Sequence, residues 1–177
     1  IMNTMTKRTL YSACLLIPII IILSCSTREK PHTTWSVYRG DRANTAYSAL
    51  DQIHTKNVSK LDVAWTYHTG DADSGNRSAI QCNPLIANGT MYVTSPKLKL
   101  IALDPATGKE RWKFDPFEDK QATGVNRGVT YWEENEDKRV YFSAGHYLYA
   151  INANDGTVIT SFGNNGKVDL RSGLGRD

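Results

Sequence analysis

The stretch that decides the fold is ALDPATGKERW, residues 102–112. It leaves an apolar run, passes through a turn and enters a second run that ends at Trp112. In the turn, Pro105 presets φ and Gly108 supplies a left-handed backbone position. This turn chemistry predicts a tight connection between two β-strands.

Short β-rich runs lie on both sides of this turn. Residues 85–87 and 91–94 flank Asn88-Gly89, a strong hairpin signal because both turn positions tolerate positive φ. Residues 98–103 predict a third strand, and residues 110–114 predict a fourth. The sequence therefore predicts one unit of four short strands.

The same pattern returns in the following residues. Strands are predicted at 128–132, 139–143, 147–152 and 157–162, with a charged turn at 133–138. This second set again amounts to four short strands.

The two units are related by a fixed period. Trp65 and Trp112 are 47 residues apart, and Gly108 and Gly156 are 48 apart. A four-stranded repeat of this length is typical of a β-propeller blade. The alternative, a compact β-sandwich, does not require such a period. The predicted fold class is therefore all-β, a β-propeller of four-stranded blades.

Composition indicates a globular chain without a nucleic-acid surface. The 177 residues are 40% hydrophobic and 22% charged, with a net charge of +3. Without the two basic residues of the first 24 positions, 19 basic residues face 18 acidic ones. Since lysines and arginines are spread among acids, no nucleic-acid partner is expected.

The N-terminal residues have the pattern of a secretory signal peptide. Lys7 and Arg8 precede the apolar residues 15–23, which predicts a secretory signal over residues 1–24. The apolar run is shorter than the roughly 20 residues of a membrane-spanning helix. Ile22-Leu23-Ser24-Cys25 resembles a bacterial lipobox, so we expect lipidation of Cys25 and a polar tether over residues 25–34. A plain signal peptide or a short membrane anchor remains the alternative.

These features indicate a membrane-anchored lipoprotein of the bacterial periplasm. Only Cys82 then remains as a thiol in the folded body, so no internal disulfide framework is expected. The chain opens on Ile1 and stops in loop-like residues 173–177, and we expect it to be a truncated reading frame.

Four stretches resemble a known family. Residues 102–112 resemble the tryptophan-docking motif of quinoprotein propellers. Residues 35–48, 81–85 and 126–132 resemble segments of dehydrogenases that depend on pyrroloquinoline quinone (PQQ), of the quinoprotein glucose dehydrogenase kind. The resemblance covers residues 35–177. It implies that about two to three blades of an eight-bladed propeller are present, as its N-terminal part.

The resemblance implies a PQQ-binding set of Arg127, Gln81 and Asn126. Arg127 would pair with a cofactor carboxylate, which a guanidinium can meet bidentately. Gln81 stands where the family often has Glu and would offer a donor and an acceptor to the ring edge. The alternatives are an ion pair of Arg127 with Glu133 or Glu134, and a merely structural stretch at Gln81.

The same resemblance places the rest of the catalytic site elsewhere. The family's catalytic Asp and its Ca²⁺ ligands are expected beyond Asp177, so no catalytic residue and no metal ligand is nominated here. Oxygen ligands suit this hard cation. The four histidines show no metal-ligand spacing.

The function implied is PQQ-dependent oxidation of an aldose or related alcohol, with electrons passed to a membrane quinone or cytochrome. Alcohol-oxidising relatives have adjacent cysteines where this chain has Gln121 and Ala122, which favours the sugar-oxidising branch. Some glucose dehydrogenases have His where this chain has Lys97. One alternative is a non-catalytic propeller lipoprotein that acts as an assembly scaffold or binding module. Another is a broken gene product without activity.

Overall fold

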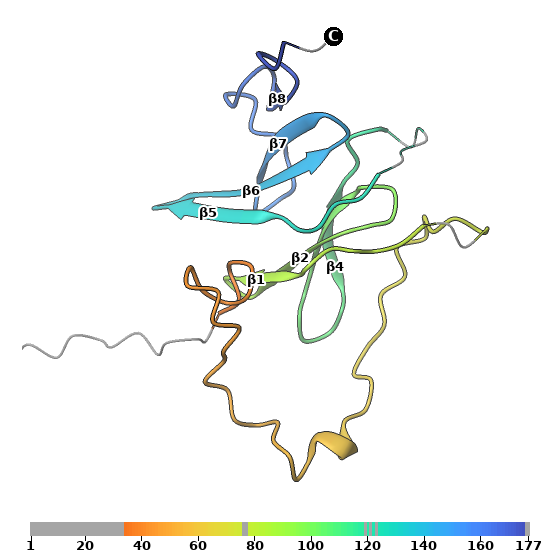
Figure 1. Ribbon diagram of the computed structural model, residues 1–177, viewed down its shortest axis with the longest axis vertical. Helices are drawn as coiled ribbons and strands as arrows, with labels where there is room; N and C mark the ends of the chain where they lie inside the picture. The colour runs from red at the N-terminus through yellow and green to blue at the C-terminus, as the bar shows by residue number, and fades with distance from the viewer. Residues whose placement is uncertain (1–33, 76–77, 119, 121, 123, 176–177) are drawn as a thin grey trace, which may run out of the picture. The chain divides into compact units, whose positions relative to one another are not determined.

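The computed structural model describes residues 34–75, 78–118, 120, 122 and 124–175. These residues form two four-stranded antiparallel sheets, one after the other along the chain (Figure 1). The predicted signal, Cys25 and nearly all of the tether lie outside the described residues. A search of the described part of the chain for a helix long and apolar enough to cross a membrane finds none.

The first sheet has the order β1-β2-β3-β4, with β1 at Leu85–Ala87, β2 at Thr90–Thr94, β3 at Leu100–Leu103 and β4 at Glu110–Phe114. The predicted hairpin turn is confirmed, since φ is 47° at Asn88 and 67° at Gly89. The predicted start of the third strand was wrong by two residues. Leu98 has φ of 63° and donates its N–H to the Ser95 carbonyl, so it belongs to the preceding turn.

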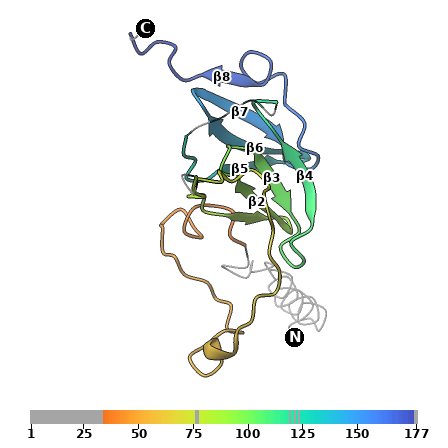
Figure 2. The same ribbon diagram turned by 90° about the vertical axis from the view of Figure 1, so that its right-hand side faces the viewer.

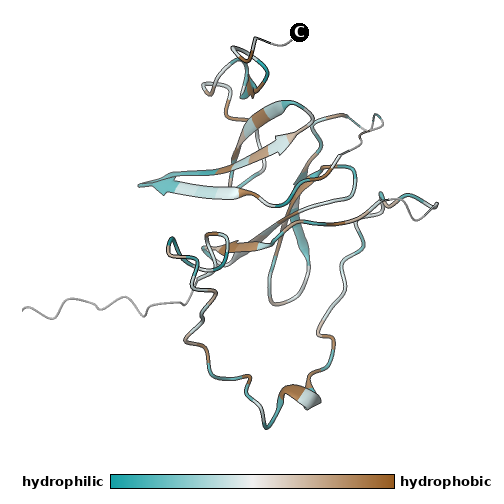
Figure 3. Cartoon of the chain, in the orientation of Figure 1, coloured by the Kyte–Doolittle hydropathy of each residue, from teal (hydrophilic) through white to brown (hydrophobic). Residues whose placement is uncertain are grey.

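The second sheet has the order β5-β6-β7-β8, with β5 at Thr130–Glu134, β6 at Asp137–Ala144, β7 at Tyr147–Asn152 and β8 at Lys167–Asp169. The predicted charged turn is shorter than expected because its outer residues pair with each other, as Glu134 does with Asp137. The tip of this hairpin is hydrophilic (Figure 3).

The prediction of a fourth strand at residues 157–162 was wrong. Ile159 donates its N–H to the Ala150 carbonyl beside β7, but no strand continues from there. Instead the chain turns, and Gly163 and Gly166 adopt φ of 55° and 85°. The outer strand is β8, which pairs with the start of β7. The Gly-Asn-Asn-Gly sequence of this turn interrupts a strand that a simple repeat would have continued.

The core lies between the two sheets, which lie next to each other in both views (Figures 1 and 2). It joins side chains of both sheets in one cluster: Ala87, Tyr92, Leu98, Leu100, Ala102, Val140, Phe142, Ala144, Tyr149, Ile151 and Ala153. Each large side chain buried here contributes about 1.5–3 kcal/mol of hydrophobic stabilisation. The two sheets are therefore held together as neighbouring blades.

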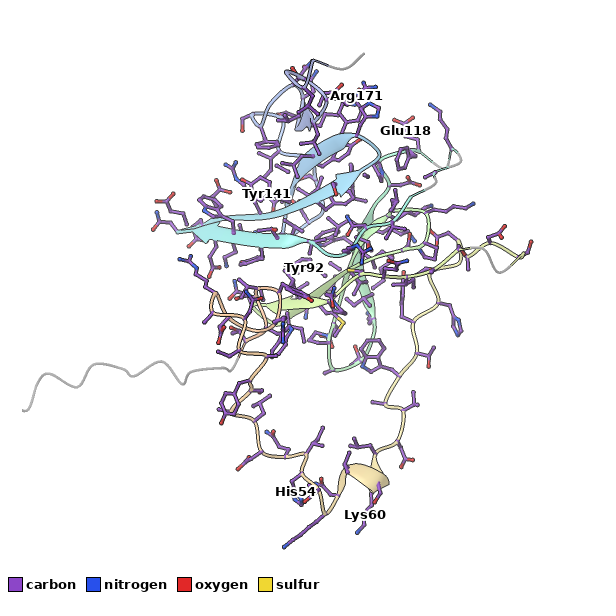
Figure 4. All side chains as sticks on the ribbon, in the orientation of Figure 1. His54, Lys60, Tyr92, Glu118, Tyr141 and Arg171 are labelled. Atoms are coloured by element: carbon purple, nitrogen blue, oxygen red, sulfur yellow. The ribbon has the colours of Figure 1, made fainter. Side chains whose placement is uncertain are left out.

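Polar contacts fix the relative placement of the blades. Tyr92 lies between the sheets, stacks on Tyr131 with ring centroids 6.0 Å apart and donates its hydroxyl to the Ala153 carbonyl at 3.2 Å (Figure 4). The indole N–H of Trp112 donates to the same carbonyl at 3.1 Å. Both contacts join the first sheet to the second, as the predicted tryptophan-docking motif requires.

Candidate cofactor-binding site

The two predicted site segments are brought side by side. Residues 81–84 lead into β1 and residues 126–129 lead into β5, and these two first strands contact each other. The backbone N–H and the side-chain amide of Asn83 both donate to the Arg127 carbonyl, at 3.0 and 2.9 Å. The segment at residues 81–84 thus contacts a segment that lies more than 40 positions later in the chain.

Asn126 directly precedes Arg127 in the second of these segments, and its side chain is only 6% exposed. Its amide nitrogen donates to the Ser143 carbonyl at 2.8 Å, and its amide oxygen accepts the Gly128 N–H at 2.8 Å. The side chain therefore ties the 126–128 segment to β6 and fixes the backbone from which Arg127 projects. Its predicted contact with a cofactor stays a prediction.

Arg127 has different surroundings. Its side chain is exposed, and within the described residues its guanidinium makes no hydrogen bond or ion pair. The alternative of an ion pair with Glu133 or Glu134 was wrong. Glu133 instead accepts hydrogen bonds from Tyr131 at 2.8 Å and Asn88 at 2.7 Å, which lower the pKa of its carboxyl. The guanidinium is left available for an external anion.

Gln81 lines an open groove of about 660 Å³. The groove wall is mainly polar or small, and Lys97 stands on its rim at the turn between β2 and β3. Its lining comprises Asp71, Ala72, Asp73, Ser74, Ser78, Ala79, Gln81, Pro96, Lys97, Ala122, Gly124 and Val125. Arg127 is not part of this lining, although it follows the groove's last residue by two positions.

Asp71 is a groove residue that sequence reasoning missed. It is 8% exposed, and its Oδ2 atom accepts the Ser95 hydroxyl at 2.5 Å and the Lys97 N–H at 3.4 Å. Its Oδ1 atom is buried and meets no donor among the described residues. The sequence offers no signal for this role, because Asp71 follows a glycine like an ordinary turn residue and its partners lie 24 and 26 positions away.

The donors of the groove and of the segment that follows its last lining residue suit a ligand with carboxylate and carbonyl oxygens. The amide of Gln81, the ammonium of Lys97 and the guanidinium of Arg127 are the relevant groups. A guanidinium in particular meets a carboxylate with two parallel hydrogen bonds. In the described part of the chain, no three His, Cys, Asp or Glu side chains are grouped to hold a metal ion. Cys82, next to Gln81, is a half-buried free thiol.

Comparison with known proteins gives a consistent result. Residues 35–177 match the family described as "PQQ: Glucose/ethanol/alcohol dehydrogenase, beta-propeller domain". The chain is 35% identical to quinoprotein glucose dehydrogenase A of Acinetobacter calcoaceticus, over 77% of this chain and 20% of that protein. It is 31% identical to quinate/shikimate dehydrogenase (quinone) of Acinetobacter baylyi, over 84% of this chain and 21% of that protein.

A solved structure shows the same arrangement of strands. Quinohemoprotein alcohol dehydrogenase from Comamonas testosteroni superposes with a TM-score of 0.62 at 30% identity, over 79% of this chain and 20% of that one. The chain thus spans about a fifth of the length of the curated relatives it matches.

Proposed function

Because the chain belongs to the β-propeller family of PQQ-dependent glucose, ethanol and alcohol dehydrogenases, we propose that it forms part of an enzyme that oxidises an aldose or a related alcohol with bound PQQ. When bound, PQQ supplies a quinone that takes up the electrons removed from the carbon bearing the substrate hydroxyl. The observation that carries the proposal is the exposed Arg127 guanidinium, which is without a partner among the described residues.

Each site residue has a proposed task that follows from its surroundings. Arg127 would hold a carboxylate of PQQ, which a guanidinium can meet bidentately. Gln81 offers a donor and an acceptor to the edge of the cofactor from the groove wall. Asn126, which is bonded to β6 and to Gly128, keeps the Arg127 backbone in place. These residues bind and orient the cofactor, and none of them is assigned a proton transfer.

Lys97 is the proposed contact to the substrate or to a cofactor carboxylate. Asp71 accepts the Lys97 backbone N–H and the Ser95 hydroxyl, so it braces the turn on which Lys97 is presented to the groove. Gln121 and Ala122 stand where alcohol-oxidising relatives have adjacent cysteines, and this difference supports an aldose as the substrate.

The remaining parts of the enzyme are proposed to lie outside residues 1–177. They are the Asp that takes the hydroxyl proton and the carboxylate and amide oxygens that hold Ca²⁺. Export by residues 1–24 and lipidation of Cys25 would hold the enzyme at the periplasmic membrane, where a membrane quinone or cytochrome accepts the electrons. The lipobox-like sequence before Cys25 supports this location.

The direct test is PQQ binding by the protein purified from its source, freed of cofactor, and by its Arg127→Gln and Arg127→Lys variants. We expect Arg127→Gln to raise the Kd of PQQ about tenfold or more, because a charge-assisted bidentate contact is lost. Arg127→Lys should have an intermediate effect, since lysine keeps the charge but not the fork geometry.

The matched control is Arg42→Gln, which removes another exposed arginine that lies outside the groove. It should leave PQQ binding unchanged. If Arg127→Gln binds PQQ as tightly as the unsubstituted protein, the assignment of Arg127 is wrong. If the unsubstituted protein binds no PQQ, the proposed function itself is wrong.

A further inference from the structure

The peptide unit that joins Arg127 to Gly128 is held at both of its polar groups. Its carbonyl oxygen accepts the backbone N–H of Asn83 at 3.0 Å and the side-chain amide of Asn83 at 2.9 Å. Its N–H donates to the amide oxygen of Asn126 at 2.8 Å. Because a peptide unit is planar, bonds at both groups fix the direction in which the whole plane faces. The backbone of Arg127 is therefore fixed on the side that leads to Gly128.

The side-chain bond of Asn83 is not needed to satisfy the Arg127 carbonyl. The backbone N–H of Asn83 already donates to that oxygen, and the Asn83 side chain is exposed, where water can satisfy its amide. An exposed bond of this kind adds little to the stability of the fold, because water competes for both of its groups. The second donor instead adds direction, since two groups of one residue hold one oxygen atom.

Gly128 supplies the backbone conformation that this arrangement requires. Its φ is 155°, which residues with a side chain rarely adopt. Space is not the reason for glycine at this position. A Cβ atom added to Gly128 would lie 3.5 Å from the Asn83 carbonyl oxygen, which is an ordinary contact. The glycine therefore serves the orientation of the peptide unit that Asn83 holds.

Asn83 also belongs to the segment that carries Gln81, the other proposed contact to the cofactor. Asn83 and Gly128 form a parallel β-bridge, so the two segments run side by side in the same direction. The strands that follow them, β1 and β5, contact each other as well. Asn83 therefore lies at the point that sets the spacing between Gln81 on one segment and Arg127 on the other.

We propose that Asn83 is a positioning residue for PQQ, which acts through Arg127 and makes no contact with the cofactor itself. The proposal rests on the proposed function, in which Arg127 holds a cofactor carboxylate. An exposed arginine loses conformational freedom when it binds an anion, and this loss lowers the affinity. Because Asn83 orders the Arg127 backbone before the cofactor binds, only the side chain remains to be ordered.

PQQ binding by the protein purified from its source, freed of cofactor, and by its Asn83→Ala variant tests the proposal. We expect Asn83→Ala to raise the Kd of PQQ about threefold or more, because the side-chain donor is lost while the backbone bond remains. In an Arg127→Gln background, the same change should alter the Kd by less than about 1.5-fold, because no guanidinium is left to position. Asn83→Asp keeps the size of the side chain but not the donor, and it should raise the Kd at least as much.

Asn57→Ala is the matched control. The Asn57 side-chain amide also donates to a backbone carbonyl, that of Gln52 at 2.7 Å, in a loop outside the groove. Asn57→Ala and Asn83→Ala each remove one such bond, so we expect a similarly small effect on the melting temperature. Only Asn83→Ala should change the Kd of PQQ. A purely structural role of Asn83 would change the melting temperature alone and would overturn the proposal.

The binding measurements separate this proposal from the proposed function. If Arg127→Gln weakens PQQ binding but Asn83→Ala does not, the role of Asn83 is wrong and the proposed function stands. The same holds if Asn83→Ala raises the Kd equally in the presence and absence of Arg127, because Asn83 would then act on its own. If the unsubstituted protein binds no PQQ, the role of Asn83 and the proposed function are both wrong.

Discussion

Asn126 and Arg127 are neighbours in the sequence, yet their side chains have opposite surroundings. The amide of Asn126 is buried and bonded to the backbone of β6 and of Gly128, whereas the guanidinium of Arg127 is exposed. The Asn-Arg-Gly motif indicated that the segment belongs to the site. The motif could not indicate that one side chain is buried and the other exposed. This difference depends on contacts of the segment with Ser143 and Asn83, which are distant in the sequence.

Asp71 provides a test at the same scale. Asp71→Ala should lower the free energy of unfolding by about 1–3 kcal/mol, because it removes the acceptor of the buried Ser95 hydroxyl. Asp71→Asn should cost less, since the amide keeps one oxygen acceptor and removes a buried charge. Urea unfolding of the 177-residue chain measures both. Asp62→Ala, at an exposed position, is the control. Equal stability of Asp71→Ala and the parent chain would contradict the bracing role.

At the scale of elements, local turn chemistry predicted much of the two sheets. Strands β1, β4 and β7 begin and end where the sequence indicated, and β1 and β4 adjoin turns of favoured geometry at Asn88-Gly89 and at residues 104–108. The last strand could not be placed in this way. Whether the chain resumes pairing after Gly163 depends on the register with β7, which is a contact between distant residues.

Tyr67 contacts Glu110 of β4, and this contact predicts that the stability of the fold depends on pH. The Tyr67 hydroxyl donates to Glu110, and burial together with this acidic partner raises the pKa of Tyr67 to about 12. In the unfolded chain the phenol loses its proton near its usual pKa of about 10. Between these two values the folded state holds more protons, so a rise in pH favours unfolding.

Thermal melting of the 177-residue chain from pH 9 to 12 measures this effect. We expect stability to fall as the pH rises above about 10, and to fall less steeply in Tyr67→Phe, which has no phenol to titrate. Tyr92, Tyr131 and Tyr149 also have raised pKa values owing to burial, so part of the slope should remain. An identical slope in Tyr67→Phe would show that Tyr67 does not contribute.

At the scale of the whole molecule, the two blades bring the two proposed cofactor-binding segments together. Gln81 and Arg127 come from the segments that lead into β1 and β5, the first strands of the two sheets, which converge. The 48-residue period of the sequence predicted the repeated blade. It could not show that Trp65 and Trp112 both donate to a carbonyl in the turn that follows a third strand, because these contacts join residues about 40 positions apart.

We propose that the whole protein is a PQQ-dependent dehydrogenase. The most direct measurement is dye reduction by the protein purified from its source, after removal of cofactor and metal, with PQQ, Ca²⁺ and an aldose added singly and together. We predict that reduction requires all three, and that primary alcohols are oxidised more slowly than aldoses. Absence of PQQ-dependent reduction with every aldose and alcohol supplied, in a protein that remains folded, would contradict the claim.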